Sequence, residues 1–475
     1  MASSKVISML IGCAMLSTSV VASSVENRQF SYDDVFKMQY ATDPIYHQSQ
    51  DLIVYVRHHM DKQTDKNVKT LWKISSDGKI NQPLISEHGS SYGAVFSPDG
   101  KKIAFIADFS GASEIYIQDL ASGKLTLLET KYTGSSKLSW STDSKQLAFS
   151  QFVKTKPSVF AAKAQKPQGA AWAKDATFID KETYRADGSG YLPNGFRQIF
   201  IANLANHKVE QMTFAAYDHK STLSWSADNT KLYFSANRQG KNELQPADTN
   251  VFWLEPNTGK VQQLTHAFGH ENNPRVSPNG KWLAYTGFKQ EYKGYHVADI
   301  YLTTLDGSET KVLTKQFDRS AKNIAWGSDS ESLFFQYDDN GNTFIAKTDF
   351  NGNMQTLTDK VGGTAFGRPY SGGSFSVNGS DKIAFTYGPV EDMANIAIVD
   401  GTASATQTTD INVQQLTQLN KQLFADIDLA SVEEINYPSS VDDANIQGWV
   451  VKPANFDASK KYPLILEIHG GPFTN

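Results

Sequence analysis

One arrangement of apolar and polar positions recurs through the middle of the chain. Each copy is an apolar stretch, a turn of Ser, Asp, Asn or Gly, and a second apolar stretch in which hydrophobic residues alternate with others. Alternation with a period of two is typical of β-strands, because successive side chains point to opposite faces of a sheet. Each copy therefore predicts a β-hairpin. The copies begin at Ile45, Ala94, Leu138, Leu223, Pro274, Ile324 and Ser374.

The spacing of these hairpins predicts a β-propeller. Successive copies begin 44 to 51 residues apart, except for one interval of 85 residues, and repeats of about 40–50 residues with this content are typical of propeller blades. A second hairpin follows each copy, as in residues 114–129 and 250–265, which gives four strands to a blade. We expect a mainly β chain with a seven-bladed propeller over residues 45–425.

The interval of 85 residues predicts one blade with an insertion at about residues 153–196. A long loop on a rigid scaffold often carries function, but a solvated surface excursion explains its Lys, Ala and Gly content equally well. Ahead of the propeller, residues 23–44 are predicted as an N-terminal helical segment. Ser31 is its expected N-cap, because a hydroxyl there can accept a hydrogen bond from the first turn.

Residues 1–22 have the order of a secretory signal peptide. The single charge of Lys5 precedes an apolar stretch, and small residues follow it. The stretch is shorter than the roughly 20 residues that a membrane-spanning helix needs. The sequence therefore predicts export, to the periplasm or out of the cell. The alternative is a lipoprotein anchored through Cys13, because residues 10–13 resemble a lipoprotein cleavage box, and membrane association is expected only in that case.

Composition limits the chemistry that the chain can perform. The net charge of -5 gives no reason to expect a nucleic acid partner. Cys13 is the only cysteine, so removal of the signal would leave no thiol for a disulfide, a zinc site or catalysis. The sequence contains neither a phosphate-binding loop nor a dinucleotide fingerprint. No cofactor and no metal are expected.

Three short motifs in the repeats are interpreted as structural. Gly89–Gly93 matches G-x-S-x-G, but a nucleophile elbow needs a strand before it and a helix after it, whereas a blade strand follows here. His266 and His270 have the spacing of metal ligands on a helix, yet they lie between blades without a matching set of further ligands. Asp338–Asn342 is predicted as a turn, because Asn-Gly is a strong hairpin signal.

The character of the chain changes after the last repeat. Residues 426–475 contain three predicted strands, at residues 432–437, 446–452 and 463–469. The third is nearly continuous in apolar residues, which suits a buried strand of an α/β sheet better than a strand of a blade. It runs into His469, Gly470 and Gly471, and a glycine pair at such a place lets the backbone turn sharply with its N–H groups exposed. Residues 426–475 are therefore predicted to be the first part of an α/β-hydrolase domain.

The segment IQGWVVKPANFDASKKYPLILEIHGGP, at residues 446–472, resembles the start of the catalytic domain of the prolyl oligopeptidase family. The acylaminoacyl-peptidase and dipeptidyl-peptidase-like branch is the most similar, and the SPDG-type repeats are similar to that branch as well. The resemblance implies a serine peptidase that hydrolyses short peptides by acyl transfer to serine, with the propeller restricting access. It also implies that Gly470 and Gly471 contribute to the oxyanion hole.

In that family the Ser, Asp and His of the triad follow the HGG strand. None of the three is therefore expected within these 475 residues, and the chain alone is expected to be inactive. The alternative function is that of a non-catalytic propeller that binds partners in the periplasm. The sequence leaves open the peptide specificity, the choice between exo- and endopeptidase, the residue that holds the substrate amino terminus, and the oligomeric state.

Overall fold

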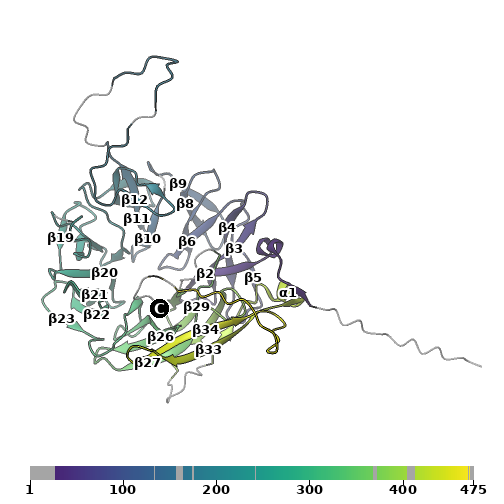
Figure 1. The fold of residues 1–475 in the computed structure, drawn as a ribbon. Helices are drawn as coiled ribbons and strands as arrows, with labels where there is room; N and C mark the ends of the chain where they lie inside the picture. Colours follow the sequence, from purple (N-terminus) through teal and green to yellow (C-terminus); the bar gives the residue numbers. More distant parts are fainter. Residues whose placement is uncertain are drawn as a thin grey trace, which may run out of the picture.

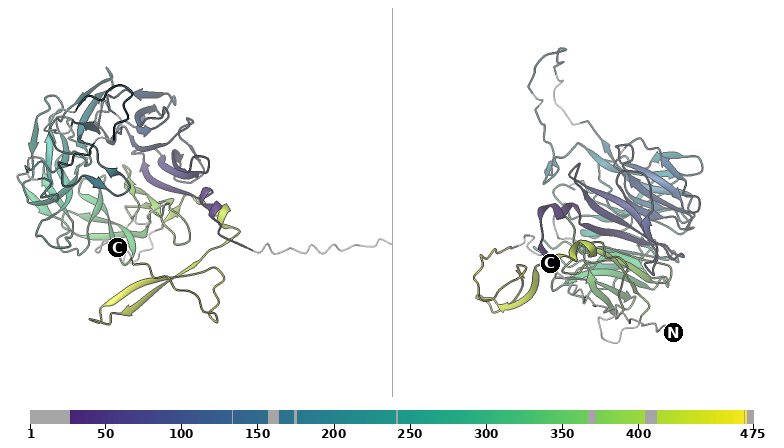
Figure 2. Two further views of the ribbon diagram at one scale, coloured as in Figure 1. Left: turned by 45° about the horizontal axis from the view of Figure 1, so that its top comes forward. Right: turned by 90° about the vertical axis from the view of Figure 1, so that its right-hand side faces the viewer.

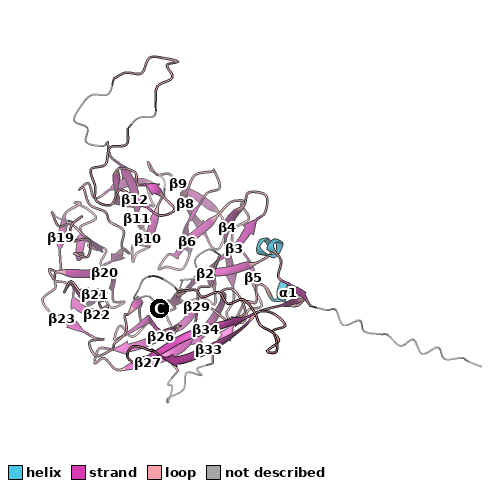
Figure 3. Cartoon of the chain, in the orientation of Figure 1, coloured by secondary structure: helices cyan, strands magenta, loops and turns pink. Residues whose placement is uncertain are grey.

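The computed structural model describes residues 27–132, 134–156, 164–173, 176–240, 242–366, 372–403, 412–468 and 470. These residues include seven sets of four antiparallel strands, arranged around a central axis like the blades of a propeller (Figure 1, Figure 3). The mainly β fold and the seven blades predicted from the repeat are confirmed.

The strands of each blade follow one another in the chain, with the first strand nearest the axis. Blade 1 contains β2 (Gln39–Tyr46), β3 (Ile53–Asp61), β4 (Lys66–Ile74) and β5 (Asn81–Pro83), and blade 2 contains β6 (Ser91–Phe96), β7 (Lys102–Ala107), β8 (Glu114–Asp119) and β9 (Leu125–Leu128). Blade 3 contains β10 (Ser136–Trp140), β11 (Gln146–Lys154), β14 (Gly195–Asn203) and β15 (Lys208–Gln211). Blade 4 contains β16 (Ser224–Trp225), β17 (Leu232–Ala236), β18 (Asn250–Leu254) and β19 (Val261–Gln263). Blade 5 contains β20 (Gly269–Val276), β21 (Trp282–Lys289), β22 (Asp299–Thr304) and β23 (Thr310–Val312). Blade 6 contains β24 (Lys322–Trp326), β25 (Ser332–Asp339), β26 (Asn342–Asp349) and β27 (Met354–Val361). Blade 7 contains β28 (Phe375–Val377), β29 (Lys382–Tyr387), β30 (Asn395–Asp400) and β31 (Gln414–Gln415).

Hydrophobic side chains pack between neighbouring blades rather than in one central core. In one cluster, Ile106 and Ile115 of blade 2 pack with Leu147 and Phe149 of blade 3, and all four are buried. Other clusters span blades 3 and 4 and blades 5 and 6 in the same way. Full burial of a side chain of this size contributes roughly 1.5–3 kcal/mol. Each blade is therefore stabilised mainly by its two neighbours.

The turn between the first two strands of a blade is hydrogen-bonded to the next blade. In blade 2 the Ser97 hydroxyl donates to the Asp99 carboxylate over 2.6 Å, and the Asp99 N–H donates to Ser144 Oγ of blade 3 over 3.0 Å. The Asn279 N–H of blade 5 donates to Ser330 Oγ of blade 6 in the same way, over 3.1 Å. The Ser, Asp and Asn residues of the repeat thus shape the turn and also join the blades.

Tryptophan makes a second link between blades. Trp140, Trp225 and Trp326 end the innermost strands of blades 3, 4 and 6, and each donates its indole N–H to a backbone carbonyl of the preceding blade over 2.9 to 3.1 Å. Each of these bonds fixes the position of one innermost strand relative to the innermost strand of the preceding blade. The wall of the central channel is therefore built from evenly placed strands.

The ring closes between blades 7 and 1 without a shared strand. The Tyr46 N–H donates to Ser376 Oγ over 2.8 Å, and the Gly379 N–H donates to the Gln48 carbonyl over 3.0 Å. The buried Asn420 side chain adds two hydrogen bonds to the backbone of Gln39, each 2.8 Å long. Hydrogen bonds from both side chains and backbone therefore hold the two ends of the propeller together.

The insertion leaves and re-enters blade 3 at one point. Strands β11 and β14 pair directly along their lengths up to Lys154 and Gly195, so the insertion separates two neighbouring strands of the same blade. Within the insertion, β12 (Arg185–Ala186) and β13 (Gly190–Tyr191) form a short hairpin. The right-hand view of Figure 2 shows this hairpin on the same side of the propeller as the C-terminal strands.

The segment before the propeller contains η1 (Tyr32–Phe36), a short 3-10 helix where the sequence predicts a helix. Ser31 Oγ donates to the Asp34 carboxylate over 2.7 Å, and Arg28 binds the same carboxylate with both Nη atoms, at 2.6 and 3.0 Å. The Arg28 guanidinium holds the pKa of Asp34 well below its usual range.

After blade 7 come α1 (Lys421–Phe424), a single helical turn, and β32 (Ile427–Asp428), which pairs in parallel with β1 (Arg28–Gln29). Strands β33 (Ser431–Pro438) and β34 (Asn445–Lys452) then form an antiparallel hairpin. They match the first two strands predicted for residues 426–475. Residues 1–26, with the predicted signal peptide and Cys13, lie outside the described residues.

The third strand predicted for this region, at residues 463–469, is wrong for the residues described. Residues 463–468 have no regular structure, and Leu464, Ile465 and Ile468 are about four-fifths exposed or more. A strand requires a hydrogen-bonded neighbour, and none of the described segments runs beside this one. No α/β-hydrolase sheet is evident among the described residues, so that part of the predicted fold is corrected to a two-stranded hairpin.

This C-terminal hairpin rests on blade 6. Gln447 Nε2 donates to the Asn340 carbonyl over 3.2 Å, and the Trp449 ring covers Gly341 so closely that a Cβ there would collide with it. Asn340 and Gly341 have positive φ angles of 47° and 75° and form the two-residue turn between β25 and β26, as the sequence predicts. Within the part of the chain that is described, no helix has the length and apolar character to span a bilayer.

The tryptophan link between blades can be tested with Trp225→Phe. The ring is retained, but the Ser139 carbonyl loses its donor, and an unsatisfied buried polar group costs roughly 1–3 kcal/mol. We expect urea unfolding to show a loss of about that size in the free energy of unfolding. Trp172→Phe is the matched control, because Trp172 is about half exposed. Equal effects of the two substitutions would contradict the role of the indole N–H.

Candidate functional site

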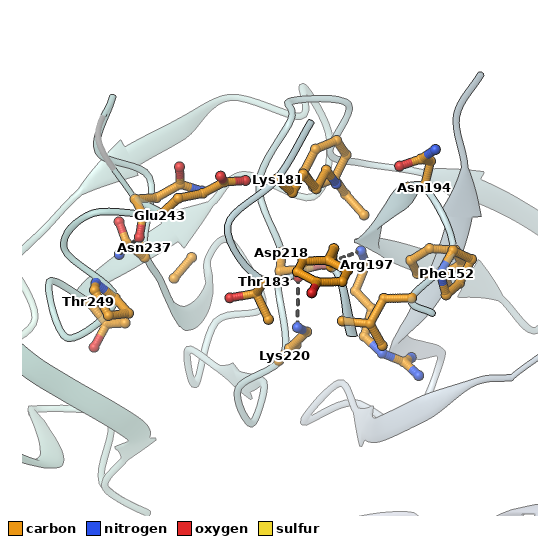
Figure 4. A pocket seen from close by; sticks show the side chains of 18 of the residues that line it. Phe152, Lys181, Thr183, Asn194, Arg197, Asp218, Lys220, Asn237, Glu243 and Thr249 are labelled. Atoms are coloured by element: carbon orange, nitrogen blue, oxygen red, sulfur yellow. Dashed lines mark hydrogen bonds and ion pairs between the residues drawn. The ribbon is translucent and has the colours of Figure 1, made fainter. Parts of the chain in front are cut away.

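A cavity of the described structure lies between the insertion and the first strands of blades 3 to 5. This cavity, the insertion pocket, has a volume of about 900 Å³ (Figure 4). The insertion contributes apolar groups such as Phe178, Tyr184 and Leu192, while the blades contribute mostly polar and charged groups. The blade residues that line it include Lys137, Arg197, Asp218, Lys220, Asn237, Thr249, His270 and Asn273.

Asp218 organises the floor of the pocket. Its Oδ1 accepts the Arg197 backbone N–H over 2.7 Å, and its Oδ2 pairs with Lys220 Nζ at 2.7 Å. The Arg197 guanidinium points away from this carboxylate and donates to the Gly134 carbonyl and to Ser136 Oγ, both over 3.1 Å. Asp218, Lys220 and Arg197 therefore satisfy one another and the backbone, which makes them structural groups of the floor.

His219 lies behind the floor and is fully buried. Its Nδ1–H donates to the Arg197 carbonyl over 2.9 Å, and its Nε2 accepts from Arg238 Nη1 over 2.8 Å. Burial lowers the pKa of this imidazole to about 4. The ring is therefore neutral near pH 7, and it positions the start of β14 relative to Arg238.

Two carboxylates of the pocket have no cationic partner among the described residues. Asp180 and Glu243 make no ion pair there, whereas the nearby Lys181 ammonium lies over the Phe196 ring at 4.4 Å. Glu243 Oε2 accepts the Glu182 backbone N–H over 3.1 Å, which fixes the carboxylate at the rim. Figure 4 shows Glu243 beside Asn237 and Thr249, on the side of the pocket opposite Phe152.

A single unpaired ammonium faces the same pocket. Lys137 of β10 lines the cavity and makes no hydrogen bond or ion pair with the described residues. Its backbone is left-handed, with φ of 57°, at a β-bulge of β10. A bulge re-aims a side chain out of its regular alternation. The pocket thus offers an ammonium group from Lys137, carboxylates from Asp180 and Glu243, and an apolar wall.

Gly470, one of the two glycines predicted for an oxyanion hole, does not line this pocket. It lies in irregular chain, with open space where a side chain would stand. Gly471 and His469 lie outside the described residues. The prediction that Gly470 and Gly471 shape an oxyanion hole stays a prediction.

Two residues of the short motifs interpreted as structural, Ser91 and His270, lie in blade strands and make hydrogen bonds there. Ser91 is the first residue of β6, is buried, and accepts the Leu71 N–H at its Oγ over 3.0 Å. His270 lies in strand β20 rather than on a helix, and its Nδ1 is 3.0 Å from Thr249 Oγ1. No group of three His, Cys, Asp or Glu side chains suited to a metal ion occurs among the described residues.

The sequence pointed to the insertion but not to the blade residues that complete the pocket. Asn237, Glu243 and Thr249 belong to the connection between β17 and β18, which spans residues 237–249. The corresponding connection in blade 2 spans only residues 108–113. Its unusual length within the repeat is the signal that could have identified these residues.

The neutral state of His219 predicts a pH dependence of stability. The folded pKa of about 4 is below the ordinary value of 6.5, so the unfolded chain takes up a proton first as the pH falls. The stabilisation is complete above pH 6.5 and is lost progressively between pH 6.5 and 4. Between pH 7.5 and pH 5, we expect the free energy of unfolding, measured with urea, to fall by about 2 kcal/mol less in His219→Gln than in the wild type. His207→Gln, at an exposed histidine, should keep the wild-type dependence; an unchanged dependence in His219→Gln would contradict the assignment.

One family model, the dipeptidyl peptidase IV N-terminal region, matches residues 172–292. This stretch holds most of the insertion pocket. Along most of the chain the sequence is similar to two curated bacterial proteins. It is 24% identical over 458 residues to the uncharacterized peptidase YuxL of Bacillus subtilis, covering 93% of this chain and 66% of that protein. It is 22% identical over 449 residues to dipeptidyl-peptidase 5 of Porphyromonas gingivalis, covering 88% and 60% respectively. The chain thus spans 60 to 66% of the length of these relatives.

Solved structures share the fold. The acylaminoacyl peptidase of Pyrococcus horikoshii superposes with a TM-score of 0.68 at 17% identity, over 90% of this chain and 60% of that one. The propeller domain of the trilobed protease from Pyrococcus furiosus, which has an open velcro topology, has a TM-score of 0.55 at 18% identity, over 82% of this chain and 98% of that one. Taken together, the family model, the relatives that align along most of the chain and the seven blades show that this chain is similar to the propeller region of peptidases of the prolyl oligopeptidase family.

Proposed function

We propose that the chain is the propeller part of an exported serine peptidase that hydrolyses short peptides, and that the insertion pocket borders the chamber where those peptides bind. The observation that carries the proposal is the pocket itself, with free groups of both signs. Asp180 and Glu243 suit the ammonium of a peptide amino terminus, and Lys137 suits a carboxylate. A short peptide is a zwitterion with an apolar body, which is the chemistry of this lining.

The position of the pocket supports the same proposal. The insertion hairpin and the C-terminal hairpin β33–β34 lie on one side of the propeller (Figure 2). A catalytic domain that continues from β34 would therefore stand over the face that bears the pocket. In such an enzyme the propeller limits access to short chains, because only these can enter a chamber closed by a rigid ring.

The proposed chemistry is acyl transfer. A serine attacks the scissile carbonyl, the amine leaves with a proton from the general base, and water then hydrolyses the acyl-enzyme. In this family the triad follows the HGG segment, so the proposal assigns no triad member to these 475 residues. The N–H groups of Gly470 and Gly471 are assigned to the oxyanion hole. Export is proposed from residues 1–22, with anchoring through a lipid on Cys13 as the alternative.

Peptide binding to the 475-residue chain tests the role of the pocket. A dipeptide with a free amino group and its N-acetyl derivative are titrated calorimetrically into the wild type and Glu243→Gln. A charged hydrogen bond is worth roughly 1.5–3 kcal/mol, so we expect the substitution to weaken binding of the free dipeptide about tenfold or more. Binding of the acetylated dipeptide should change little.

Glu87→Gln is the matched control, because Glu87 is exposed and lies away from the pocket. If the wild type binds neither dipeptide, or if Glu243→Gln affects both dipeptides equally, the pocket does not recognise an amino terminus. A non-catalytic propeller that binds larger partners would then be the better assignment.

A further inference from the structure

One arginine differs from its counterparts around the central channel. Arg275 of β20 pairs with Ala284 of the second strand, and strand register identifies the corresponding residue in every other blade. Those residues are all uncharged. They are Ile45, Val95, Ser139, Ser224, Ala325 and Ser376. Arg275 is therefore the single charge at this level of the ring.

Arg275 lines a second cavity, the axial cavity, with a volume of about 690 Å³. Ile45, Ala325 and Ser376 line it as well, so side chains from blades 1, 5, 6 and 7 meet there. The cavity extends to the turns that end the innermost strands, whereas the insertion pocket lies at their starts. Among the described residues that line it, Arg275 is the only charged one.

The Arg275 guanidinium has no partner among the described residues. Its backbone carbonyl accepts the Trp326 indole N–H over 2.9 Å, but no hydrogen bond, ion pair or aromatic contact reaches the side chain. Arg275 is exposed. Solvent therefore reaches its guanidinium, which is free to pair with an anionic ligand.

The nearby carboxylates of the turns are engaged elsewhere. Asp381 Oδ1 accepts the Ser328 N–H over 2.7 Å, and its Oδ2 is 3.7 Å from Lys347 Nζ. Asp329 accepts the N–H and the hydroxyl of Ser332 at 3.0 and 2.9 Å. Neither carboxylate lines the axial cavity.

Two hydroxyls of the cavity keep a proton to donate. Ser374 Oγ accepts the Asp43 N–H over 3.1 Å, and Ser376 Oγ accepts the Tyr46 N–H over 2.8 Å. Each hydroxyl oxygen is thus held in place by the backbone of blade 1, while its O–H has no acceptor among the described residues. The cavity combines one cation, two preset hydroxyl donors and an apolar wall from Ile324 and Phe375.

We propose that the axial cavity binds the carboxylate of a small molecule with an apolar body, such as the free carboxyl end of an amino acid or short peptide, through Arg275. The planar guanidinium matches a carboxylate with two parallel hydrogen bonds. A single positive charge balances a single negative one, whereas a phosphate at neutral pH carries more charge than this lining offsets.

The probe for this site is N-acetyl-leucine, which has a carboxylate and an apolar body but no amino group. It is titrated into the full 475-residue chain by calorimetry and by tryptophan fluorescence, since Trp326 lines the cavity. We expect N-acetyl-leucine to bind saturably to the wild type and about tenfold or more weakly to Arg275→Gln. Binding should also be weaker to Arg275→Lys, which keeps the positive charge but loses the two parallel N–H donors of the guanidinium. N-acetyl-leucinamide should not bind.

Arg185→Gln is the matched control, at an exposed arginine in the insertion. Trp326→Phe should abolish the fluorescence change while calorimetry still detects binding, which places the ligand in the axial cavity even if the arginine variants fold poorly. Absence of binding to the wild type, equal affinity for the amide, or tighter binding of inorganic phosphate would each overturn the proposal. Because the probe lacks an amino group and the reporter lies in the axial cavity, none of these outcomes bears on Glu243 and the insertion pocket.

Discussion

The structure depends on the hydrogen bonds that fasten the innermost strand of one blade to the next blade. A single blade cannot bury its apolar faces alone, because they are covered only when neighbouring blades pack against them. The turn bonds from Asp99 to Ser144 and from Asn279 to Ser330, together with the indole bonds of Trp140, Trp225 and Trp326, set the spacing of the blades. With that spacing fixed, the apolar faces of adjacent blades meet and their packing supplies most of the stabilisation.

The same constraint explains where the two cavities lie. The innermost strands are held in equivalent positions in their blades. The starts of these strands therefore form one rim of the central channel, and the turns at their ends form the opposite rim. The insertion extends from the rim at the strand starts, tied to blade 3 by the pairing of Lys154 with Gly195. Groups at that rim, such as Lys137 at its bulge, and groups at the other end, such as Arg275, are therefore set in place before any ligand arrives.

Much of the fold could be predicted because the repeat encodes it locally. The alternation of apolar residues and the Asn340-Gly341 turn each specify geometry within a few residues, and the period of about 50 residues then counts the blades. The strand expected at residues 463–469 shows the limit of this reasoning. An apolar run such as Leu464–Ile468 indicates burial, but a strand also needs a paired neighbour, and sequence pattern alone does not supply one. The pocket was harder still to predict, since Lys137 is distant in sequence from Asn237 and Glu243 and comes near them only through the ring.

The seam between blades 7 and 1 closes the ring, and native-state hydrogen exchange of Ser376→Ala tests most directly whether bonds between blades hold it together. Ser376 Oγ accepts the Tyr46 N–H across the seam, so its loss should open the ring there first. The account predicts faster exchange of amides in blades 1 and 7, with wild-type protection retained in blades 3 to 5. Uniformly faster exchange in all seven blades, or no change at the seam, would contradict it.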